Sequence, residues 1–362
     1  MQAVNIDDIL KEAERQLMIC NACRYCEGYC DLWDAIERKR SFPPNDVFHL
    51  SNLCHDCRDC YYACQYTPPH PFSIDIPGIL SKVRELSYRR FVYPKFMQRY
   101  VSSIYRFINY IYVILTIIIF AISISLTLFL HGFSLFRTYI PYQSLLPPYI
   151  FLAVEYLLYI YVVFMWYMEA RSYWKSISNG IRFSLGEVLK GVKDALIHKD
   201  FTGGGAGCSY PLEYFPDQGK NPKPSRFRLH AHATVVIGFI IDLISILFYP
   251  FKGTVTPAIF LIGSIMIAVG ALSLLYKRKY DRLVHEDGGL AFTLMLSIAS
   301  ISGIIAIVLS LYHQPLYAVF FLLRASIIAS LFIMAPYSKF VHLVFRLVSL
   351  MRDRFEEYNV KK

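Results

Sequence analysis

The chain has 362 residues, of which 55% are hydrophobic, and its formal net charge is +10. A mean hydropathy of +0.38 indicates a membrane protein rather than a soluble domain. Residues 1–105 hold many of the charges and eight of the nine cysteines, whereas long apolar runs dominate the remainder. We therefore predict a cytoplasmic N-terminal domain over 1–105, a transmembrane helical bundle over 106–350 with a cytoplasmic loop at 169–229, and a cytoplasmic tail over 351–362.

Three stretches of the N-terminal domain have the pattern of short helices. Residues 5–19 predict an amphipathic helix that leads into the first cysteine, and residues 31–39 predict a second helix that Pro43 and Pro44 bring to an end. Residues 74–90 predict a third helix, which runs towards the membrane. No alternating strand pattern lies between the cysteines, so we predict an α-helical ferredoxin-like domain and a mainly α protein.

Two runs of cysteines share the spacing C-x2-C-x2-C-x3-C and are separated by 23 residues. This repeat is typical of paired cubane iron–sulfur clusters, in which the fourth cysteine of each run binds the other cluster. Such clusters support one-electron transfer. The spacing predicts one [4Fe–4S] cluster on Cys20, Cys23, Cys26 and Cys64 and a second on Cys54, Cys57, Cys60 and Cys30.

Zinc and disulfides are the alternative uses of these cysteines. Zinc sites usually pair two close ligands with two more after a long gap, and they do not need a third and fourth thiol at this spacing. Disulfides suit small secreted domains rather than a chain of this kind. The iron–sulfur interpretation is therefore favoured, and it predicts about eight irons where a zinc protein would hold about one or two.

Six apolar runs follow the cysteine domain. Each reaches or approaches the roughly 20 residues that a helix needs to cross the hydrocarbon of a bilayer. They predict a six-helix transmembrane bundle. The runs are Phe107–Leu130, Pro148–Met168, Ala231–Phe248, Pro257–Tyr276, Leu290–Leu311 and Leu316–Phe345.

The charges of the connecting loops predict the orientation of the bundle. The loops 169–229 and 277–289 carry ten and four Lys or Arg, and the opposite loops carry only Arg137 and Lys252. Cytoplasmic loops hold the excess of basic residues. We therefore expect a multi-pass protein of the cell membrane with both termini and the cysteine domain in the cytoplasm. Lipid then accounts for the basic charge, and no nucleic-acid partner is needed.

Three histidines lie at the predicted cytoplasmic ends of membrane helices. His230 and His232 begin the third apolar run, and His342 lies near the end of the sixth. Histidines from two facing helices can bind a b-type haem from both sides. The sequence therefore suggests one haem b, although histidines at helix ends can also simply occupy the headgroup zone.

Two charged residues of opposite sign lie inside the apolar runs. Asp242 is in the third run and Arg324 in the sixth. Ionisable residues within a membrane are functional candidates by default. We predict that the two residues pair or line a polar cavity, although helix tilt or water must close a depth difference of about 12 Å.

The loop at 169–229 contains the glycine-rich sequence DFTGGGAGCSYP and the ninth cysteine, Cys208. No strand precedes it and no Gly-Lys-Ser/Thr follows, so a tight turn packed against the cysteine domain is favoured over a nucleotide site. One cysteine cannot build a third cluster by itself.

Four separate blocks, ICNACRYCEGYC, LCHDCRDCYYACQYTPPHPF, GGGAGCSYP and PYSKFVHLVFR, resemble the tricarballylate/citrate-utilisation protein B family of membrane electron-transfer proteins. This resemblance implies that electrons come from a flavoprotein dehydrogenase partner and reach the quinone pool. The segment PYSKFVH is also similar to the haem-bearing nitrate reductase gamma subunit, which implies that His342 is a haem ligand. Asp242 and Arg324 occupy the positions spaced like a second histidine pair, so at most one haem is expected.

The chain shows no flavin fingerprint, no nicotinamide motif and no acid–base constellation for a carbon substrate. We therefore predict an electron-transfer subunit of a quinone-reducing oxidoreductase, in which the carbon substrate belongs to the partner. The alternative is a metal-binding membrane anchor or sensor without electron transfer.

Overall fold

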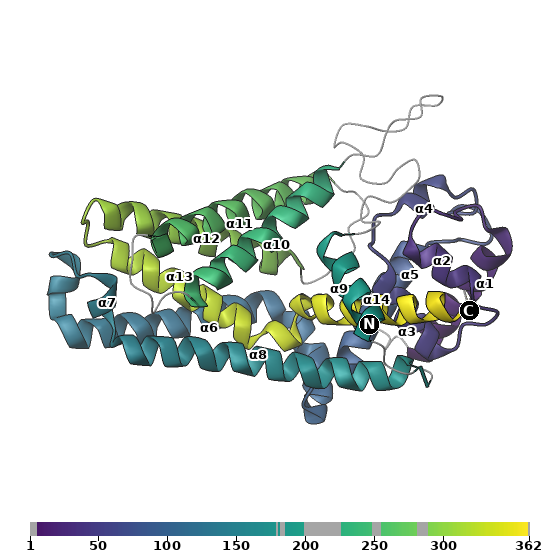
Figure 1. The fold of residues 1–362 in the computed structure, drawn as a ribbon, viewed down its shortest axis with the longest axis horizontal. Coiled ribbons are helices and arrows are strands. Elements are labelled where there is room, and N and C mark those ends of the chain that lie inside the picture. Colours follow the sequence, from purple (N-terminus) through teal and green to yellow (C-terminus); the bar gives the residue numbers. More distant parts are fainter. Residues whose placement is uncertain are drawn as a thin grey trace. The chain divides into compact units, whose positions relative to one another are not determined.

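The structure is a computed structural model of the chain, and it describes residues 6–178, 180–181, 185–198, 226–247, 255–280 and 289–360. Throughout these ranges the regular elements are α- and 3₁₀-helices, so the prediction of a mainly α protein is confirmed (Figure 1). The chain forms two compact units. The first comprises Met1–Val101, Trp166–Leu229 and Val341–Lys362, and the second comprises Ser102–Met165 and His230–Phe340.

The first unit contains the three helices that the N-terminal sequence predicts and further helices that it does not, among them α3 (Pro44–Leu53). This helix begins at Pro44, because proline is well placed at the first position of a helix, where its missing N–H has no partner to lose. The two prolines that end one helix therefore also begin the next. The helices of this unit are α1 (Ile6–Cys23), α2 (Asp31–Glu37), α3 (Pro44–Leu53), α4 (Asp59–Ala63), α5 (Ile76–Phe91), η1 (Lys95–Met97), α9 (Leu185–Leu196) and α14 (His342–Val360).

Apolar residues at helical spacing hold the first unit together. On α5, the side chains of Ile76, Ile79, Leu80 and Val83 are all buried. These positions repeat at intervals of three and four residues and so form one face of the helix. That face packs against α1, which carries Cys20, and against α3, which Cys54 directly follows.

Residues 351–360, which belong to the predicted cytoplasmic tail, form the last part of α14. Buried ion pairs join this helix to the cysteine domain. The Arg352 guanidinium pairs with Asp46 on α3, and the Arg354 Nε atom lies 2.5 Å from a carboxylate oxygen of Asp194 on α9. The last helix is therefore part of the same core as the N-terminal helices.

The second unit is built from the apolar helices. Among the described residues, five helices are long and apolar enough to cross a membrane, at Lys95–Phe136, Leu152–Ile177, Phe227–Ser245, Pro257–Arg278 and Gly289–Leu311. The elements are α6 (Gln98–His131), η2 (Gly132–Phe136), α7 (Tyr142–Leu145), α8 (Pro148–Ile177), α10 (Phe227–Leu247), α11 (Val255–Tyr280), α12 (Gly289–Leu311), α13 (Tyr317–Ile333), η3 (Ala335–Tyr337) and η4 (Lys339–Val341). Three of these helices, α6, α8 and α10, have one end in the first unit.

The sixth apolar run differs from its prediction as one continuous span over Leu316–Phe345. It is divided into α13, two short 3₁₀-helices and the beginning of α14. Pro336 explains the break, because proline has no N–H to donate and its ring clashes with the preceding turn of an α-helix. With 17 residues, α13 is at the lower limit of length for crossing the hydrocarbon.

The last part of α8 belongs to the first unit and carries a buried tyrosine that joins four helices. The Tyr173 hydroxyl lies 2.8 Å from the hydroxyl of Ser349 on α14 and 3.1 Å from the side-chain amide nitrogen of Asn52 on α3. The same amide nitrogen donates to the hydroxyl of Ser87 on α5, at 3.0 Å. Because all four side chains are buried, this network fixes α3, α5, α8 and α14 against one another.

Candidate metal centre

The first cysteine run lies where α1 ends and α2 begins. Cys20 and Cys23 are in the last turn of α1, and Cys30 is the residue that precedes α2. The intervening chain turns twice through left-handed backbone, at Arg24 with φ of 55° and at Gly28 with φ of 76°. Glycine suits the second turn because it has no Cβ to clash in this conformation. The two turns bring thiols from a helix end and a helix start to the same region.

The second run is placed by α3 and α4. Cys54 directly follows α3, Cys60 is inside α4 and Cys64 directly follows α4. The loop between the helices has left-handed backbone at Asp56 and Arg58, with φ of 53° and 65°. The identical spacing of the two runs is therefore accommodated by different local structures.

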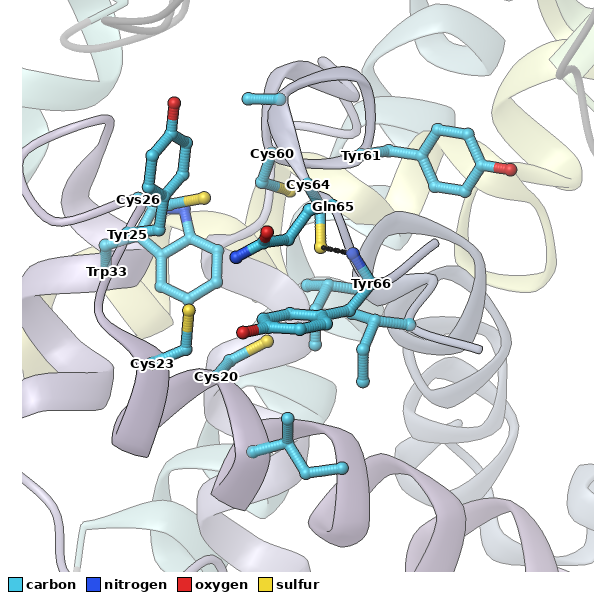
Figure 2. A pocket seen from close by; sticks show the side chains of 14 residues that line it. Cys20, Cys23, Tyr25, Cys26, Trp33, Cys60, Tyr61, Cys64, Gln65 and Tyr66 are labelled. Carbon is cyan, nitrogen blue, oxygen red and sulfur yellow. Dashed lines mark hydrogen bonds between the residues drawn. The ribbon is translucent and has the colours of Figure 1, made fainter. Parts of the chain in front are cut away.

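Thiols from both runs line a cavity of about 170 Å³. Trp33, Tyr66 and Ile76 contribute to its walls, and the backbone N–H of Tyr66 donates to the Cys64 Sγ atom at 3.3 Å. Figure 2 shows the thiols of Cys20, Cys23, Cys26 and Cys64 turned towards a common space. The cysteines that line this cavity are Cys20, Cys23, Cys26, Cys60 and Cys64. Cys60 also lines a second, neighbouring space.

The second space is smaller and has the complementary set of thiols. Its volume is about 10 Å³, which is room for about one water molecule, so a cluster can enter only if the thiols move outward. His55 and Arg58 also line it. Its four cysteines are Cys54, Cys57 and Cys60 of the second run and Cys30, the fourth cysteine of the first run.

Crowding makes these thiols hard to ionise without a cation. Burial, followed by the neighbouring thiols, raises the pKa of Cys20 and of Cys26 to about 12. The pKa values of Cys30 and Cys60 are raised well above the ordinary value for the same two reasons. A bound metal group would favour the thiolates and remove their mutual repulsion. The donor set therefore fits a thiolate-bound metal group.

Among the residues that the structure describes, no three His, Cys, Asp or Glu side chains converge closely enough to hold a single metal ion. The thiols surround a space instead of meeting at a point. A cubane cluster needs thiols that surround a space, since its four thiolates bind four different iron atoms.

The three histidines predicted to bind haem are at the beginnings of two helices. His230 is exposed and His232 is partly buried near the start of α10, and His342 is the first residue of α14. His230 and His232 belong to the second unit and His342 to the first. Two residues apart on a helix, His230 and His232 point to different faces, so only one of them can face a given partner.

The predicted pairing of Asp242 with Arg324 is confirmed. The Arg324 Nη2 atom lies 2.5 Å from the Asp242 Oδ2 atom, and its Nη1 atom donates to the Ser264 hydroxyl at 3.0 Å. All three side chains are buried in the second unit. The Arg324 guanidinium also lies over the Phe260 ring, 4.0 Å from its centroid.

Close packing of two helices brings Asp242 and Ser264 together. A Cβ atom added to Gly238 on α10 would lie 2.9 Å from the carbonyl oxygen of Gly263 on α11. Small residues of this kind let membrane helices approach at backbone distance.

Sequence reasoning missed three arginines that contact the second cysteine run. Arg84, Arg228 and Arg346 were treated only as charges of a helix or a loop, and each donates to backbone carbonyls within residues 51–56. The spacing of the arginines gives no sign of these contacts. The glycine-rich sequence and Cys208 lie outside the described residues.

The helices and the thiol-lined spaces define a multi-pass membrane protein with an iron–sulfur type of N-terminal domain. The family description "Citrate utilization protein B Fer4-like domain" matches residues 13–90, which contain all eight paired cysteines. Over 368 aligned residues, the chain is 26% identical to the citrate utilization protein B of Escherichia coli, with 97% of this chain and 93% of that protein covered. The predicted resemblance to the citrate utilization protein B family is therefore confirmed. No solved structure matches the chain.

Proposed function

We propose that this chain is a membrane electron-transfer protein that takes electrons from a flavoprotein dehydrogenase and delivers them to the quinone pool. The observation that carries the proposal is the exchange of cysteines between the two runs. Cys64 lines the cavity of the first run, and Cys30 lines the space of the second. Paired [4Fe–4S] clusters require this exchange, whereas two independent zinc sites do not.

When bound, two such clusters supply one-electron transfer. Under this proposal, the ligands of one cluster are Cys20, Cys23, Cys26 and Cys64, and those of the other are Cys54, Cys57, Cys60 and Cys30. The residues of the chain hold the thiolates apart, limit access of water and donate N–H groups to sulfur. Two of these donors are the N–H of Asp56 to Cys54 at 3.4 Å and that of Tyr66 to Cys64 at 3.3 Å.

The proposal includes one b-type haem bound by His342 with either His232 or His230. The similarity of PYSKFVH to the nitrate reductase gamma subunit supports His342. The Asp242–Arg324 pair supports a single haem, because two residues that are engaged with each other occupy the positions of a second histidine pair.

Orientation and partner are part of the same proposal. The excess of Lys and Arg in the loops 169–229 and 277–289 supports cytoplasmic termini and a cytoplasmic cysteine domain in the cell membrane. The relative in Escherichia coli is named for citrate utilization, which supports a partner that oxidises a carboxylic acid. The cysteine domain is the proposed docking face for that partner.

Iron and zinc analysis of the detergent-purified protein, followed by spectra before and after dithionite, tests this proposal. We expect about eight irons, a broad bleach near roughly 400 nm and a sharp reduced band near roughly 560 nm. Cys57→Ala should abolish quinone reduction by the reduced protein while the membrane helices remain inserted. About one or two zinc ions without iron, or an unchanged quinone reduction rate in Cys57→Ala, would instead support a metal-binding anchor or sensor.

A further inference from the structure

Three arginines from different helices donate hydrogen bonds to the segment that carries Cys54. From α5, the Arg84 guanidinium donates to the carbonyl oxygens of Ser51 and Cys54, at 2.8 and 2.7 Å. The contacts of the other two arginines involve the residues on either side of Cys54. Arg346 of α14 donates to the Leu53 carbonyl at 2.8 Å and to the His55 Nε2 atom at 2.7 Å, and Arg228 of α10 donates to the carbonyls of His55 and Asp56 at 2.6 and 2.9 Å.

The contacts of Arg84 and Arg346 use neutral acceptors, so they leave positive charge beside the second group of thiols. Within the part of the chain that the structure describes, neither Arg84 nor Arg346 is ion-paired with a carboxylate. The carboxylates that act on the two arginines, Asp31 and Asp56, are shared with other cations. Asp31 lies 3.4 Å from a nitrogen of Arg354, and Asp56 lies 3.6 Å from a nitrogen of Arg58.

The two arginines also lie close to each other. Burial and the nearby Arg84 lower the pKa of Arg346 to about 10, while Asp31 and the thiols of Cys54 and Cys30 act on it in the opposite direction. Cations removed from water are normally paired with an anion. Thiolates that hold a cluster, itself anionic, would supply that anion.

The first group of thiols has a different electrostatic environment. Among the described residues, none that lines its cavity is an Asp, Glu, Lys or Arg. Arg58 and Asp59 both line the second space, and Arg84, Arg228 and Arg346 contact the carbonyls around Cys54. The excess of positive charge therefore lies beside the second group.

We propose that Arg84, Arg228 and Arg346 make the second cysteine group the one with the higher midpoint potential, so that electrons enter at Cys20, Cys23, Cys26 and Cys64 and leave from Cys30, Cys54, Cys57 and Cys60. This inference rests on the proposed electron-transfer function. One-electron reduction adds one negative charge to a cysteine group, and positive charge nearby favours that change. The charge around a cluster and the hydrogen bonds to its sulfurs are known determinants of its potential. The arginines act as positioning and electrostatic residues that do not bind the metal.

A redox titration followed by electron paramagnetic resonance, on the full chain in detergent, tests this inference. Cys23→Ala and Cys57→Ala assign the two midpoints to the two groups. Arg346→Gln removes a charge, Arg346→Lys keeps it, and Arg89→Gln is the matched control, since Arg89 is on the same helix as Arg84 and pairs with Glu85. If Arg346→Gln does not fold, Arg84→Gln and Arg84→Lys replace this pair of variants.

We expect the second group to have the higher midpoint in the unmodified protein. In Arg346→Gln, the midpoint potential of the second group should fall by about 59 mV, and that of the first group should not change. For a one-electron couple, this shift lowers the equilibrium constant for electron transfer from the first group to the second by about tenfold. Arg346→Lys and Arg89→Gln should leave both midpoints in place. A higher midpoint for the first group, or equal shifts in the Gln and Lys variants, would overturn the inference while about eight irons would still uphold the proposed function. A protein without iron would refute both.

Discussion

Removing the Arg324 guanidinium is expected to destabilise the membrane unit strongly. The side chains of Arg324 and Asp242 are each only 8% exposed, and their closest nitrogen and oxygen atoms are 2.5 Å apart. In Arg324→Met, the apolar part of the side chain is largely kept, and the Asp242 carboxylate remains among apolar helices without its partner. The variant also loses the hydrogen bond to Ser264 and the contact with Phe260.

The size of the stability loss in Arg324→Met depends mainly on the cost of leaving the Asp242 carboxylate buried without its partner. Hydrogen bonds between membrane helices contribute only about 0.6 to 2 kcal/mol, because the unfolded chain in the membrane also finds partners. An unpaired carboxylate at the centre of a membrane helix costs about 3 kcal/mol, and breaking a buried ion pair costs about 3–5 kcal/mol. The charge term is therefore the larger one, and we expect a loss of about 3–5 kcal/mol in the free energy of unfolding.

Equilibrium unfolding in mixed micelles with increasing SDS, followed by circular dichroism, measures this loss. The matched controls are Asp242→Asn and the double variant with both substitutions. Because the double variant leaves no unpaired charge, it should be more stable than Arg324→Met alone by about 2 kcal/mol or more. A loss below about 1 kcal/mol in Arg324→Met, or strictly additive losses in the double variant, would refute the account of a buried pair.

Three further predictions concern the cysteine unit and the proposed haem. Gly28→Ala should lower the free energy of unfolding by about 1 kcal/mol and reduce the iron content. The cost comes only from the positive φ, because a Cβ at this position meets no atom within 4 Å. Thermal unfolding and iron analysis measure the two effects, and a variant with unchanged stability and iron content would contradict the prediction. Tyr173→Phe should lower the free energy of unfolding by about 1–1.5 kcal/mol, because the buried hydroxyl loses its hydrogen bonds to the Phe48 carbonyl and the Ser349 hydroxyl; a loss below about 0.5 kcal/mol in thermal unfolding would count against the network. His342→Ala should remove the reduced band near roughly 560 nm while His313→Ala retains it, and a band that persists in His342→Ala would exclude His342 as a ligand.

The grouping of the cysteines could be predicted from the sequence because their spacing encodes it. Two runs with the same C-x2-C-x2-C-x3-C pattern predict an exchange of the fourth cysteine, and the structure places Cys64 and Cys30 with the opposite runs. This information is local in the chain. The different helical settings of the runs could not be predicted, since Cys20 ends a helix and Cys54 follows one although both begin the same pattern.

Prolines mark breaks in this chain, but a proline can begin a helix as well as end one. Pro44 begins α3, because its fixed φ suits the first turn of a helix. The prediction of the sixth run used hydropathy and did not consider Pro336. It therefore gave one long span where the chain forms two α-helices. Hydropathy measures the solvent that a segment prefers, whereas the backbone hydrogen bonds determine where its helix ends.

Contacts to backbone carbonyls are the part of the site that no sequence pattern reveals. Arg84 and Arg346 are about 30 and 290 residues from the carbonyls that they contact. Every residue has such a carbonyl, so nothing in the composition of residues 51–56 identifies the partner. The pairing of Asp242 with Arg324 was predictable for the opposite reason, because few ionisable residues occur inside the membrane runs.

The position of α14 gives the proposed electron route a direction. Arg346, which contacts His55 beside Cys54, is four residues after His342 and therefore lies on the same face of the helix. The proposed haem ligand is thus one helical turn from a residue that contacts the second cysteine group, within one compact unit. Buried pairs such as Arg352 with Asp46 hold this helix against α3, which Cys54 directly follows. This arrangement supports exit of electrons from the second group towards His342, and it agrees with the higher potential that the arginines are proposed to give that group.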